Sequence, residues 1–407
     1  MYINKIKVNE IRHLKDFEID LGENKNHLIL TGKNGSGKTT LLKEISDYLK
    51  KVRSKDILRL EQMKSNISIW KSNVDSLSKK ERTPKDEMNY QNYLRWIKDD
   101  ELNIKSLTKL EIDLNNLSLI MEKLNVNEFI IKMFETKRSS QMTRSQGVEL
   151  IDLESLKSNI YDKQSWFLKY MVHLKTQLAY AVTDNDTKEI ERIKSWFNRF
   201  EKLLKTIFET ENVELIYDRK KYNFTIKQND KEFDFNTLSD GFSAVLEIIT
   251  GIMMGMEKEE EELHQYDMNG IVLIDELDTH LHISLQKKIF KLLTEFFPNI
   301  QFIITTHSPF ILNSVENVVI YDLEKKILQK DMTQYTYDAI SELYFGATSH
   351  SEILLEQVAK YEYLAKKEIK TSLEEKEFNE LEVKFDNLIT DVSEELAMKI
   401  WDIKGLK

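Results

Sequence analysis

The stretch Gly32-Lys33-Asn34-Gly35-Ser36-Gly37-Lys38-Thr39 fits the pattern Gly-x-x-x-x-Gly-Lys-Thr and follows the apolar run His27-Leu28-Ile29-Leu30. In such a loop, backbone N–H groups close around phosphate oxygens, and a helix, expected here from Leu41 onward, turns its positive end toward the anion. Lys38 would reach the β and γ phosphates, and Thr39 would give its hydroxyl to Mg²⁺. Because a strand and a helix flank the loop, we predict nucleotide binding instead of a chance glycine turn.

The composition indicates a largely helical protein of a reducing compartment. Three prolines accompany 31% charged residues, and cysteine is absent, which excludes disulfides, thiolate catalysis and cysteine-ligated zinc. No apolar run approaches the roughly 18 to 20 residues of a membrane span. The net charge of −10 argues against a globally basic nucleic-acid binder, although a local patch for DNA or RNA stays open. We expect a cytoplasmic protein with no membrane contact.

The N-terminal part of the chain alternates apolar and polar residues. Strands are predicted over Ile3 to Val8, Phe17 to Leu21 and Leu28 to Leu30. The basic turn Ile11 to Lys15 would lie near the nucleotide or form a solvated hairpin.

The chain from Leu41 to about Leu124 is predicted to be helical. Apolar residues recur there at spacings of three and four, most regularly at Leu107, Leu110, Leu114 and Leu117. Pro84 marks a turn between two antiparallel helices. We expect a helical hairpin inserted over residues 51–124 with a solvated charged face.

A strand over Phe129 to Glu135 precedes a second helical block, about Leu153 to Phe208, whose aromatic stripes favour a packed core over a ligand platform. A hairpin is then predicted from Val213 to Ile226. The predicted head is discontinuous, over 1–50, 125–150 and 211–330, with a helical subdomain over 151–210 and a helical tail over 331–407.

The segment Leu238-Ser239-Asp240-Gly241-Phe242 resembles the Leu-Ser-Gly-Gly-Gln signature of ABC-type ATPases, with Asp240 and Phe242 as departures. Ser239 and the Gly241 N–H, at the start of a predicted helix, would bind a γ-phosphate held by another subunit. An ordinary helix cap is the alternative.

Two acids end the apolar strand Ile271-Val272-Leu273-Ile274, as in a Walker B motif. Asp275 would hold Mg²⁺ through water, and Glu276 would orient or deprotonate the attacking water. A buried carboxylate without a partner costs several kcal/mol, which favours this functional interpretation over a structural one. Asp278 falls where such ATPases place the D-loop at the dimer interface.

Histidines follow at two places. His280 and His282 have a spacing that also fits a metal pair, but no further His or Cys cluster supports it, and Mg²⁺ favours oxygen ligands. After the predicted strand Gln301 to Thr305 comes Thr306-His307-Ser308-Pro309-Phe310. His307 stands where ABC-type ATPases place a histidine that contacts the γ-phosphate.

Together these motifs resemble the ABC ATPase superfamily, in its soluble RecF, SMC and OLD-like branch, over about Met1 to Tyr321. The runs Asp275 to His282 and Thr305 to Phe310 are similar to those of AAA-type ATPases in bacterial anti-phage systems, with the Septu ATPase subunit, PtuA, as the nearest family. The resemblance implies an α/β fold: an ABC-ATPase head with a P-loop parallel sheet, an N-terminal antiparallel sheet, helical insertions and a C-terminal helical tail.

The resemblance also implies an ATPase that uses ATP and Mg²⁺, with Lys38, Glu276 and His307 in hydrolysis. Further nucleotide contacts would come from Arg12, Asn34, Gly35, Ser36, Gly37, Thr39, Thr40, Ser239 and Gly241. Thr39 and Asp275 would bind the metal together with a Q-loop glutamine, either Gln141 or Gln146. Two heads would sandwich ATP, giving a homodimer or higher homo-oligomer.

A nuclease motif is not evident in the sequence. No Asp-x-Asp cluster of a Toprim domain lies between Ile311 and Lys407, and Asp184-Asn185-Asp186 is better interpreted as a helix cap. We therefore expect a separate nuclease subunit of the HNH type. It would dock on a tail of two amphipathic helices, Ser351 to Lys367 and Leu373 to Ile400. The alternative is that this tail simply packs on the head. A DNA-repair or chromosome-structuring ATPase and a transporter subunit are the alternatives.

Overall fold

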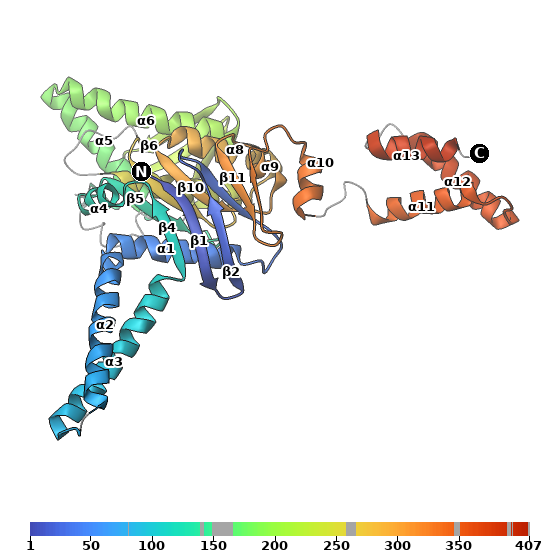
Figure 1. The fold of residues 1–407 in the computed structure, drawn as a ribbon. Coiled ribbons are helices and arrows are strands. Elements are labelled where there is room, and N and C mark those ends of the chain that lie inside the picture. Colours follow the sequence, from blue (N-terminus) through green and yellow to red (C-terminus); the bar gives the residue numbers. More distant parts are fainter. Residues whose placement is uncertain are drawn as a thin grey trace. The chain divides into compact units, whose positions relative to one another are not determined.

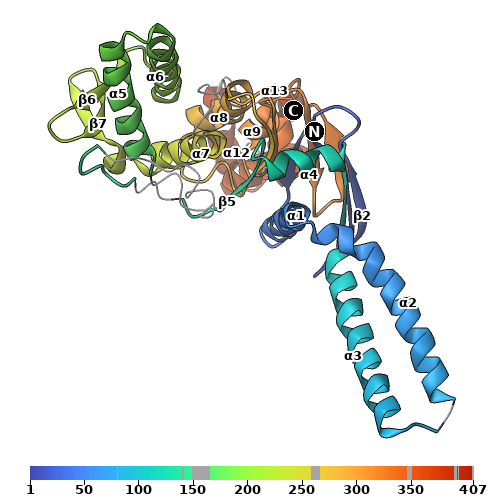
Figure 2. The same ribbon diagram turned by 90° about the vertical axis from the view of Figure 1, so that its left-hand side faces the viewer.

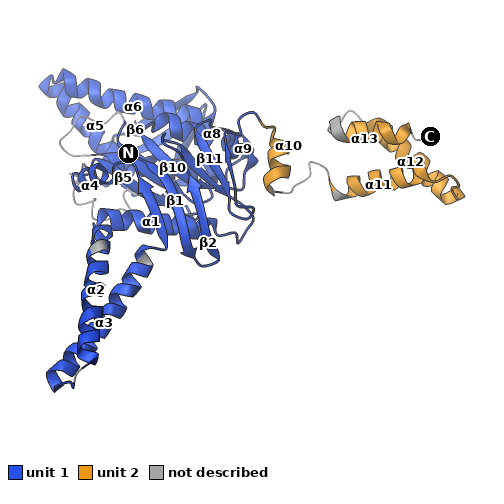
Figure 3. Cartoon of the chain, in the orientation of Figure 1, with its two compact units in different colours: residues 1–334 blue, residues 335–407 orange. Residues whose placement is uncertain are grey.

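The computed structural model describes residues 1–79, 81–138, 142–148, 166–257, 266–345, 351–388, 392 and 394–405. Two compact units divide the chain, within residues 1–334 and 335–407 (Figure 3). The first unit holds every sheet and all the predicted site motifs, so its strands are the frame from which the site is built.

A six-stranded sheet forms the centre of the first unit, in the order β12-β11-β3-β10-β9-β5 (Figure 1). Its strands are β3 (His27–Thr31), β5 (Phe129–Phe134), β9 (Asn269–Ile274), β10 (Ile300–Thr305), β11 (Val318–Asp322) and β12 (Ile327–Lys330). All pairs are parallel except β11 with β12. Strands buried on both faces have nearly continuous apolar sequences, and β3 and β10 are buried at every position.

This arrangement confirms the predicted α/β class with a parallel sheet beneath the glycine-rich loop. The loops after β3, β9, β10 and β5 all leave from the carboxyl ends of parallel strands. In open α/β sheets that edge is where ligands bind. Helix α1 (Lys38–Arg53), which continues the loop, packs against β10 and β5.

An N-terminal antiparallel sheet has the order β2-β1-β4, with β1 (Ile3–Ile11), β2 (Leu14–Asp20) and β4 (Leu110–Leu114). The helix predicted through residues 110–114 is wrong, because this segment pairs with β1. Leu110, Ile112 and Leu114 are buried and alternate with exposed acids, which is a period of two. The leucines at positions 107, 110, 114 and 117 belong to three successive elements, so their helical spacing is a coincidence.

The predicted helical hairpin lies within residues 59–107. Helices α2 (Arg59–Ser78) and α3 (Pro84–Leu107) lie side by side, as Figures 1 and 2 both show. Thr83 and Asp86 cap α3 reciprocally, and Pro84 occupies its first turn, which confirms the turn predicted there. After β4, α4 (Leu117–Asn125) leads into β5.

A helical pair and a small sheet separate β5 from the signature segment. Helices α5 (Phe167–Asp184) and α6 (Thr187–Phe208) precede an antiparallel sheet of β6 (Val213–Asp218), β7 (Asn223–Gln228) and β8 (Lys231–Asp234). The predicted aromatic stripes are core, as the burial of Phe167, Trp196 and Phe200 confirms. Asp186 caps α6 as predicted, whereas β8 is a third strand that the hairpin prediction missed.

The second unit is helical. It contains α10 (Tyr337–Ile340), a π-helical turn (Ser341–Phe345), α11 (Glu352–Lys366), α12 (Ser372–Leu388) and α13 (Glu394–Lys404). The single helix predicted from Leu373 to Ile400 is wrong: α12 ends and α13 begins within it. Tyr361, Phe385 and Ile400 form a core shared by the last three helices. Within the described part of the chain, no helix combines the length and the apolar character that crossing a bilayer requires.

Candidate nucleotide site

The phosphate-binding loop turns sharply between β3 and α1. Gly35 (φ 83°) and Gly37 (φ 100°) adopt left-handed backbone conformations that favour glycine. The ammonium of Lys38 donates hydrogen bonds to the carbonyl oxygens of Gly32 (2.8 Å) and Lys33 (3.1 Å). The lysine side chain therefore curls back over its own loop, where an anion bound by the loop would meet it.

The turn between β1 and β2 packs against this loop. A Cβ at Gly37 would lie 3.0 Å from Leu14 Cδ1 and 3.1 Å from His13 Nε2. The same His13 nitrogen lies 3.1 Å from the carbonyl oxygen of Ser36. The basic turn thus lies beside the loop, and it is His13 that touches it. Arg12 is exposed in a left-handed conformation (φ 55°), so its predicted contact with phosphate or ribose stays a prediction.

Asp275 lies at the centre of a cluster of hydroxyl groups. Its carboxylate is 2% exposed and accepts hydrogen bonds from Thr39 (3.0 Å), Thr305 (2.7 Å) and Thr136 (2.9 Å). Thr39 lies in the first turn of α1 after β3, Thr305 ends β10, and Thr136 follows β5, so all three lie at the carboxyl edge of the parallel sheet. Thr39 and Asp275, 236 positions apart in the sequence, are thereby in direct contact.

Glu276 has a left-handed backbone (φ 48°), a conformation that is uncommon for a residue with a side chain. The strain of such a conformation is found most often at functional sites. Its N–H donates to Thr305 Oγ1 (2.6 Å), and its carboxylate accepts from Thr279 (3.1 Å). Arg138 donates to the backbone carbonyls of both Asp275 and Glu276, the latter at 3.0 Å. Three polar groups therefore fix the direction in which the carboxylate leaves the strand.

His307 and Lys38 share the same environment. Burial lowers the pKa of His307 below its ordinary value, and the nearby Lys38 ammonium lowers it further. Burial also lowers the pKa of Lys38, against the opposing field of Glu276 and neighbouring acids. Asp278 accepts from Thr306 (2.6 Å) and from the His307 N–H (3.3 Å), which ties the segment after β9 to the segment after β10.

The signature segment lies in a different place. Ser239 is the N-cap of α7 (Asp240–Met256) and is exposed, and its side chain makes no capping hydrogen bond. With Gly241, His280 and His282 it lines a cavity of about 400 Å³. Among the residues that the structure describes, no hydrogen bond links Ser239 or Gly241 to the loop or to Asp275, whereas Thr39 and Asp275 contact each other directly.

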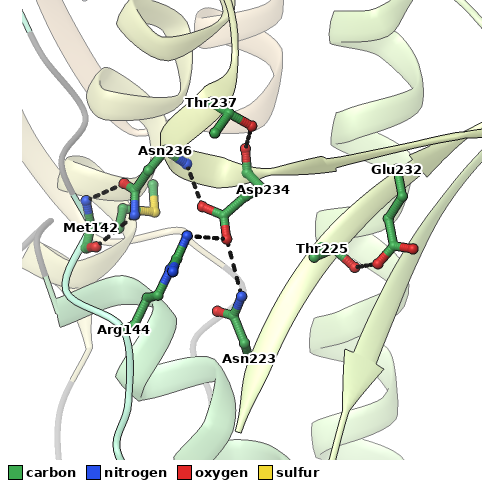
Figure 4. A network of polar contacts seen from close by, with 8 residues as sticks. All are labelled: Met142, Arg144, Asn223, Thr225, Glu232, Asp234, Asn236 and Thr237. Carbon is green, nitrogen blue, oxygen red and sulfur yellow. Dashed lines mark hydrogen bonds and ion pairs between the residues drawn. The ribbon is translucent and has the colours of Figure 1, made fainter. Parts of the chain in front are cut away.

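A polar network joins the signature segment to the chain beyond β5 (Figure 4). The Asn236 side chain accepts from the Met142 N–H (2.7 Å) and donates to the Met142 carbonyl (2.9 Å). Asp234 accepts from Arg144 (3.0 Å) and from Asn223 (3.1 Å). Residues 142–144 are therefore held against the segment that leads into the signature.

The predicted Q-loop glutamine falls in the same region. Gln141 lies outside the described residues, and Gln146 is exposed. A glutamine was predicted in this region, whereas the residues found to contact Asp275 are Thr136 and Arg138, which no motif indicated. Their position was the available signal, since both follow the end of β5 at the same sheet edge as Asp275.

The donor set fits a nucleotide with Mg²⁺. Thr39 and Asp275 offer the oxygen ligands that Mg²⁺ prefers, and the buried Ser36 hydroxyl in the loop makes no hydrogen bond with any described residue. No group of three or more His, Cys, Asp or Glu side chains with metal-site geometry occurs in the described ranges. His280 and His282 lie instead beside the signature.

The chain is similar in sequence to a known family and to two of its relatives. The family described as "AAA domain, putative AbiEii toxin, Type IV TA system" matches residues 28–313. The chain is 25% identical to the "Retron Vc95 probable ATPase" of Vibrio cholerae serotype O1 biovar El Tor, over 84% of this chain and 79% of that protein. It is 24% identical to the "Septu protein PtuA" of Bacillus thuringiensis, over 76% of this chain and 72% of that protein. The predicted resemblance to the Septu ATPase subunit is thereby confirmed.

Among solved structures, an Smc head bound to the C-winged helix domain of ScpA is 12% identical to the chain. It covers 83% of this chain and 100% of its own, with a TM-score of 0.42.

Proposed function

The chain belongs to this AAA-domain family, and from that premise we propose that it binds and hydrolyses ATP with Mg²⁺ at the carboxyl edge of its parallel sheet. The observation that carries the proposal is the direct contact of Thr39 with Asp275, 3.0 Å apart. It brings the phosphate-binding loop to the acidic end of β9, and Glu276 and the half-buried His307 lie beside them.

Each residue has a distinct role in this proposal. Lys38 releases its two loop carbonyls and pairs with the β and γ phosphates. Thr39 and Asp275 would hold Mg²⁺, whose charge would offset that of the phosphate during transfer. Glu276 orients the attacking water and accepts its proton, from a position fixed by Arg138. His307, neutral because its pKa is lowered, contacts the γ-phosphate.

The test compares three variants in steady-state turnover and in nucleotide binding. Glu276→Gln should hydrolyse ATP far more slowly and still bind it, whereas Lys38→Ala should lose binding. Glu18→Gln, at an exposed position of β2, is the matched control and should behave as wild type. Normal turnover by Glu276→Gln would mean that another group activates the water, and tight ATP binding by Lys38→Ala would contradict the loop assignment.

We also propose that two chains complete one site between them. Within the described residues, Ser239 and Gly241 make no hydrogen bond with the loop of their own chain, and the exposed Ser239 is accessible to a nucleotide held by a second copy. Lys38→Ala and Ser239→Arg should each be inactive alone. When mixed, the first chain supplies its signature to the intact loop of the second, so turnover should return. A mixture that stays inactive, with both variants folded, would contradict the composite site.

A role in bacterial anti-phage defence is supported by the names of the relatives, a retron ATPase and a Septu protein. We propose that the chain regulates or senses for a separate nuclease subunit of the HNH type. The second unit carries exposed apolar side chains suited to such a partner, at Ile353, Tyr363 and Trp401. Tyr363→Glu with Trp401→Glu should abolish co-purification of a nuclease encoded beside this chain, and the exposed-site control Lys376→Glu should not.

An unchanged co-purification would contradict this docking site. The alternative, an ATPase of DNA repair or chromosome structure, predicts turnover that rises when DNA is added and no associated nuclease. Measuring turnover with and without duplex DNA separates the two functions.

A further inference from the structure

A second cavity, of about 550 Å³, lies on the other part of α1, away from the loop. Its apolar lining comes from Leu49 of α1 and from Ile131, Met133 and Phe134 of β5. Ligand cavities of roughly 300–1,000 Å³, mostly apolar with a few placed polar groups, are typical of small-molecule sites. The volume and the lining therefore fit a ligand of modest size with one apolar face.

Two of the three acids that line the cavity are paired, and the third, Glu247, is 8% exposed. Asp47 forms an ion pair with Lys50 at 2.8 Å, and Glu135 forms one with Lys43 at 3.5 Å. Lys132, buried in the wall, donates to the carbonyl of Gly251 at 3.2 Å. The carboxylates of Asp47 and Glu135 are thereby neutralised within the protein itself.

Arg53, like Lys137, differs from the other cations that line the cavity, which have partners within the protein. Its guanidinium is half-buried, burial lowers its pKa, and among the described residues it makes no hydrogen bond or ion pair. A desolvated cation normally has an anionic partner, and the negative end of α1, where Arg53 lies, compensates only part of its charge. The guanidinium fork matches carboxylate and phosphate oxygens in two-point contacts.

We propose that this cavity binds a small organic phosphate with a flat apolar group, of the size of a nucleoside monophosphate. The apolar group lies against Phe134 and Met133, and the phosphate pairs with Arg53 and with Lys137 at the opening. Lys137 is exposed and, within the described chain, makes no ion pair, so it is available for a second contact with the anion.

The cavity is built on the two elements that also carry the candidate ATP site. Helix α1 begins with Lys38 and Thr39, and the chain after β5 supplies Thr136 and Arg138, which contact Asp275. An occupant that joins α1 to β5 therefore changes ATP affinity, and ATP changes the occupant's affinity by the same factor. This mutual change of affinity depends on the proposed ATPase function, whereas binding in the cavity does not.

Equilibrium dialysis of the full chain tests binding directly, with labelled AMP, GMP, CMP or UMP and with excess Mg²⁺–ATPγS to occupy the loop. At least one monophosphate should bind, and Arg53→Leu should weaken it roughly tenfold, the equivalent of one charge-assisted hydrogen bond. Arg53→Lys keeps the charge without the fork and should fall between the two. Arg59→Leu removes an exposed arginine of α2 and should leave binding unchanged.

Three outcomes would overturn the proposal: no monophosphate binds, Arg59→Leu weakens binding as much as Arg53→Leu, or inorganic phosphate binds as tightly as the best monophosphate. Thermal melts of every variant show whether a loss of binding follows from misfolding, in which case Arg53→Lys decides. Binding that persists when turnover is absent would support the cavity and count against the proposed ATPase function alone.

Discussion

The side-chain amide of Asn236 holds the backbone of Met142 from both sides, accepting from its N–H at 2.7 Å and donating to its carbonyl at 2.9 Å. Asn236→Leu removes both bonds, and Asn236→Asp keeps only the acceptor. A neutral hydrogen bond at a partly exposed position contributes about 0.5–1 kcal/mol, so denaturant melts should show about twice the loss for leucine. ATP turnover should fall in the same order.

Asn103→Leu, on the exposed surface of α3, is the control for that pair and should change neither quantity. Equal effects of leucine and aspartate at position 236 would show that the two bonds do not act separately.

Gly241 packs directly on the segment after β9. A methyl group there would lie 2.7 Å from the carbonyl oxygen of His280, closer than real Cβ atoms approach backbone oxygen. Gly241→Ala should therefore shift the start of α7 and cost about 1–3 kcal/mol of unfolding free energy. Gly147→Ala is the control, since a methyl at Gly147 meets nothing within 4 Å. If both variants melt at the wild-type temperature, the close contact does not constrain the fold.

His307 should determine the acid limb of the rate profile. Burial and the nearby Lys38 ammonium lower its pKa below the ordinary 6.5, so it gains its proton at lower pH than a free histidine does. The half-point of the acid decline in turnover should therefore lie below pH 6.5, and His307→Gln should lack this decline. A wild-type rate that already halves above pH 6.5 would contradict the assignment.

Glu257 should make stability depend on pH. It is buried, accepts from Trp196 (3.2 Å) and Tyr266 (3.4 Å), and burial raises its pKa from 4.5 to about 7. The folded state therefore keeps a proton that the unfolded state has lost. The resulting stabilisation is full below pH 4.5 and is lost as the pH rises to about 7, a total change of about 3 kcal/mol in the free energy of unfolding. Glu257→Gln should lose this dependence and exceed wild type in stability at pH 8.

Denaturant melts between pH 4.5 and pH 8 measure that difference. Glu214→Gln, at an exposed position of β6, should follow the wild-type curve. Parallel curves for wild type and Glu257→Gln would show that the buried carboxyl does not set the slope.

Local patterns were sufficient for the loop and for the strand that ends in Asp275. Both depend on short runs of sequence whose chemistry is strict: glycines with left-handed backbones beside Lys38, and two acids after four apolar residues. Thr39, Asp275 and His307 each follow a parallel strand, and parallel strands present their carboxyl ends at one edge of the sheet, a rule that the motifs alone do not use.

The failures arose where two patterns overlap or where a contact is remote. Leu110 and Leu114 fit both a helix and a strand, and only pairing with β1 decides between them. Arg138 contributes through hydrogen bonds to backbone carbonyls of Asp275 and Glu276, which no motif encodes. The Asn236–Met142 contact likewise spans 94 positions and leaves no local signal.

The pairing of β4 with β1 also has a mechanical consequence. Both ends of the hairpin are anchored, one through α1 and the other through β4, where Lys109 pairs with Glu44 at 3.5 Å. Adding or deleting matched helical turns in α2 and α3 changes its reach by about 5.4 Å per turn without altering the register of β4 on β1. The length of the hairpin can thus change while its two points of attachment stay the same, so its reach is independent of the sheets that carry the candidate site.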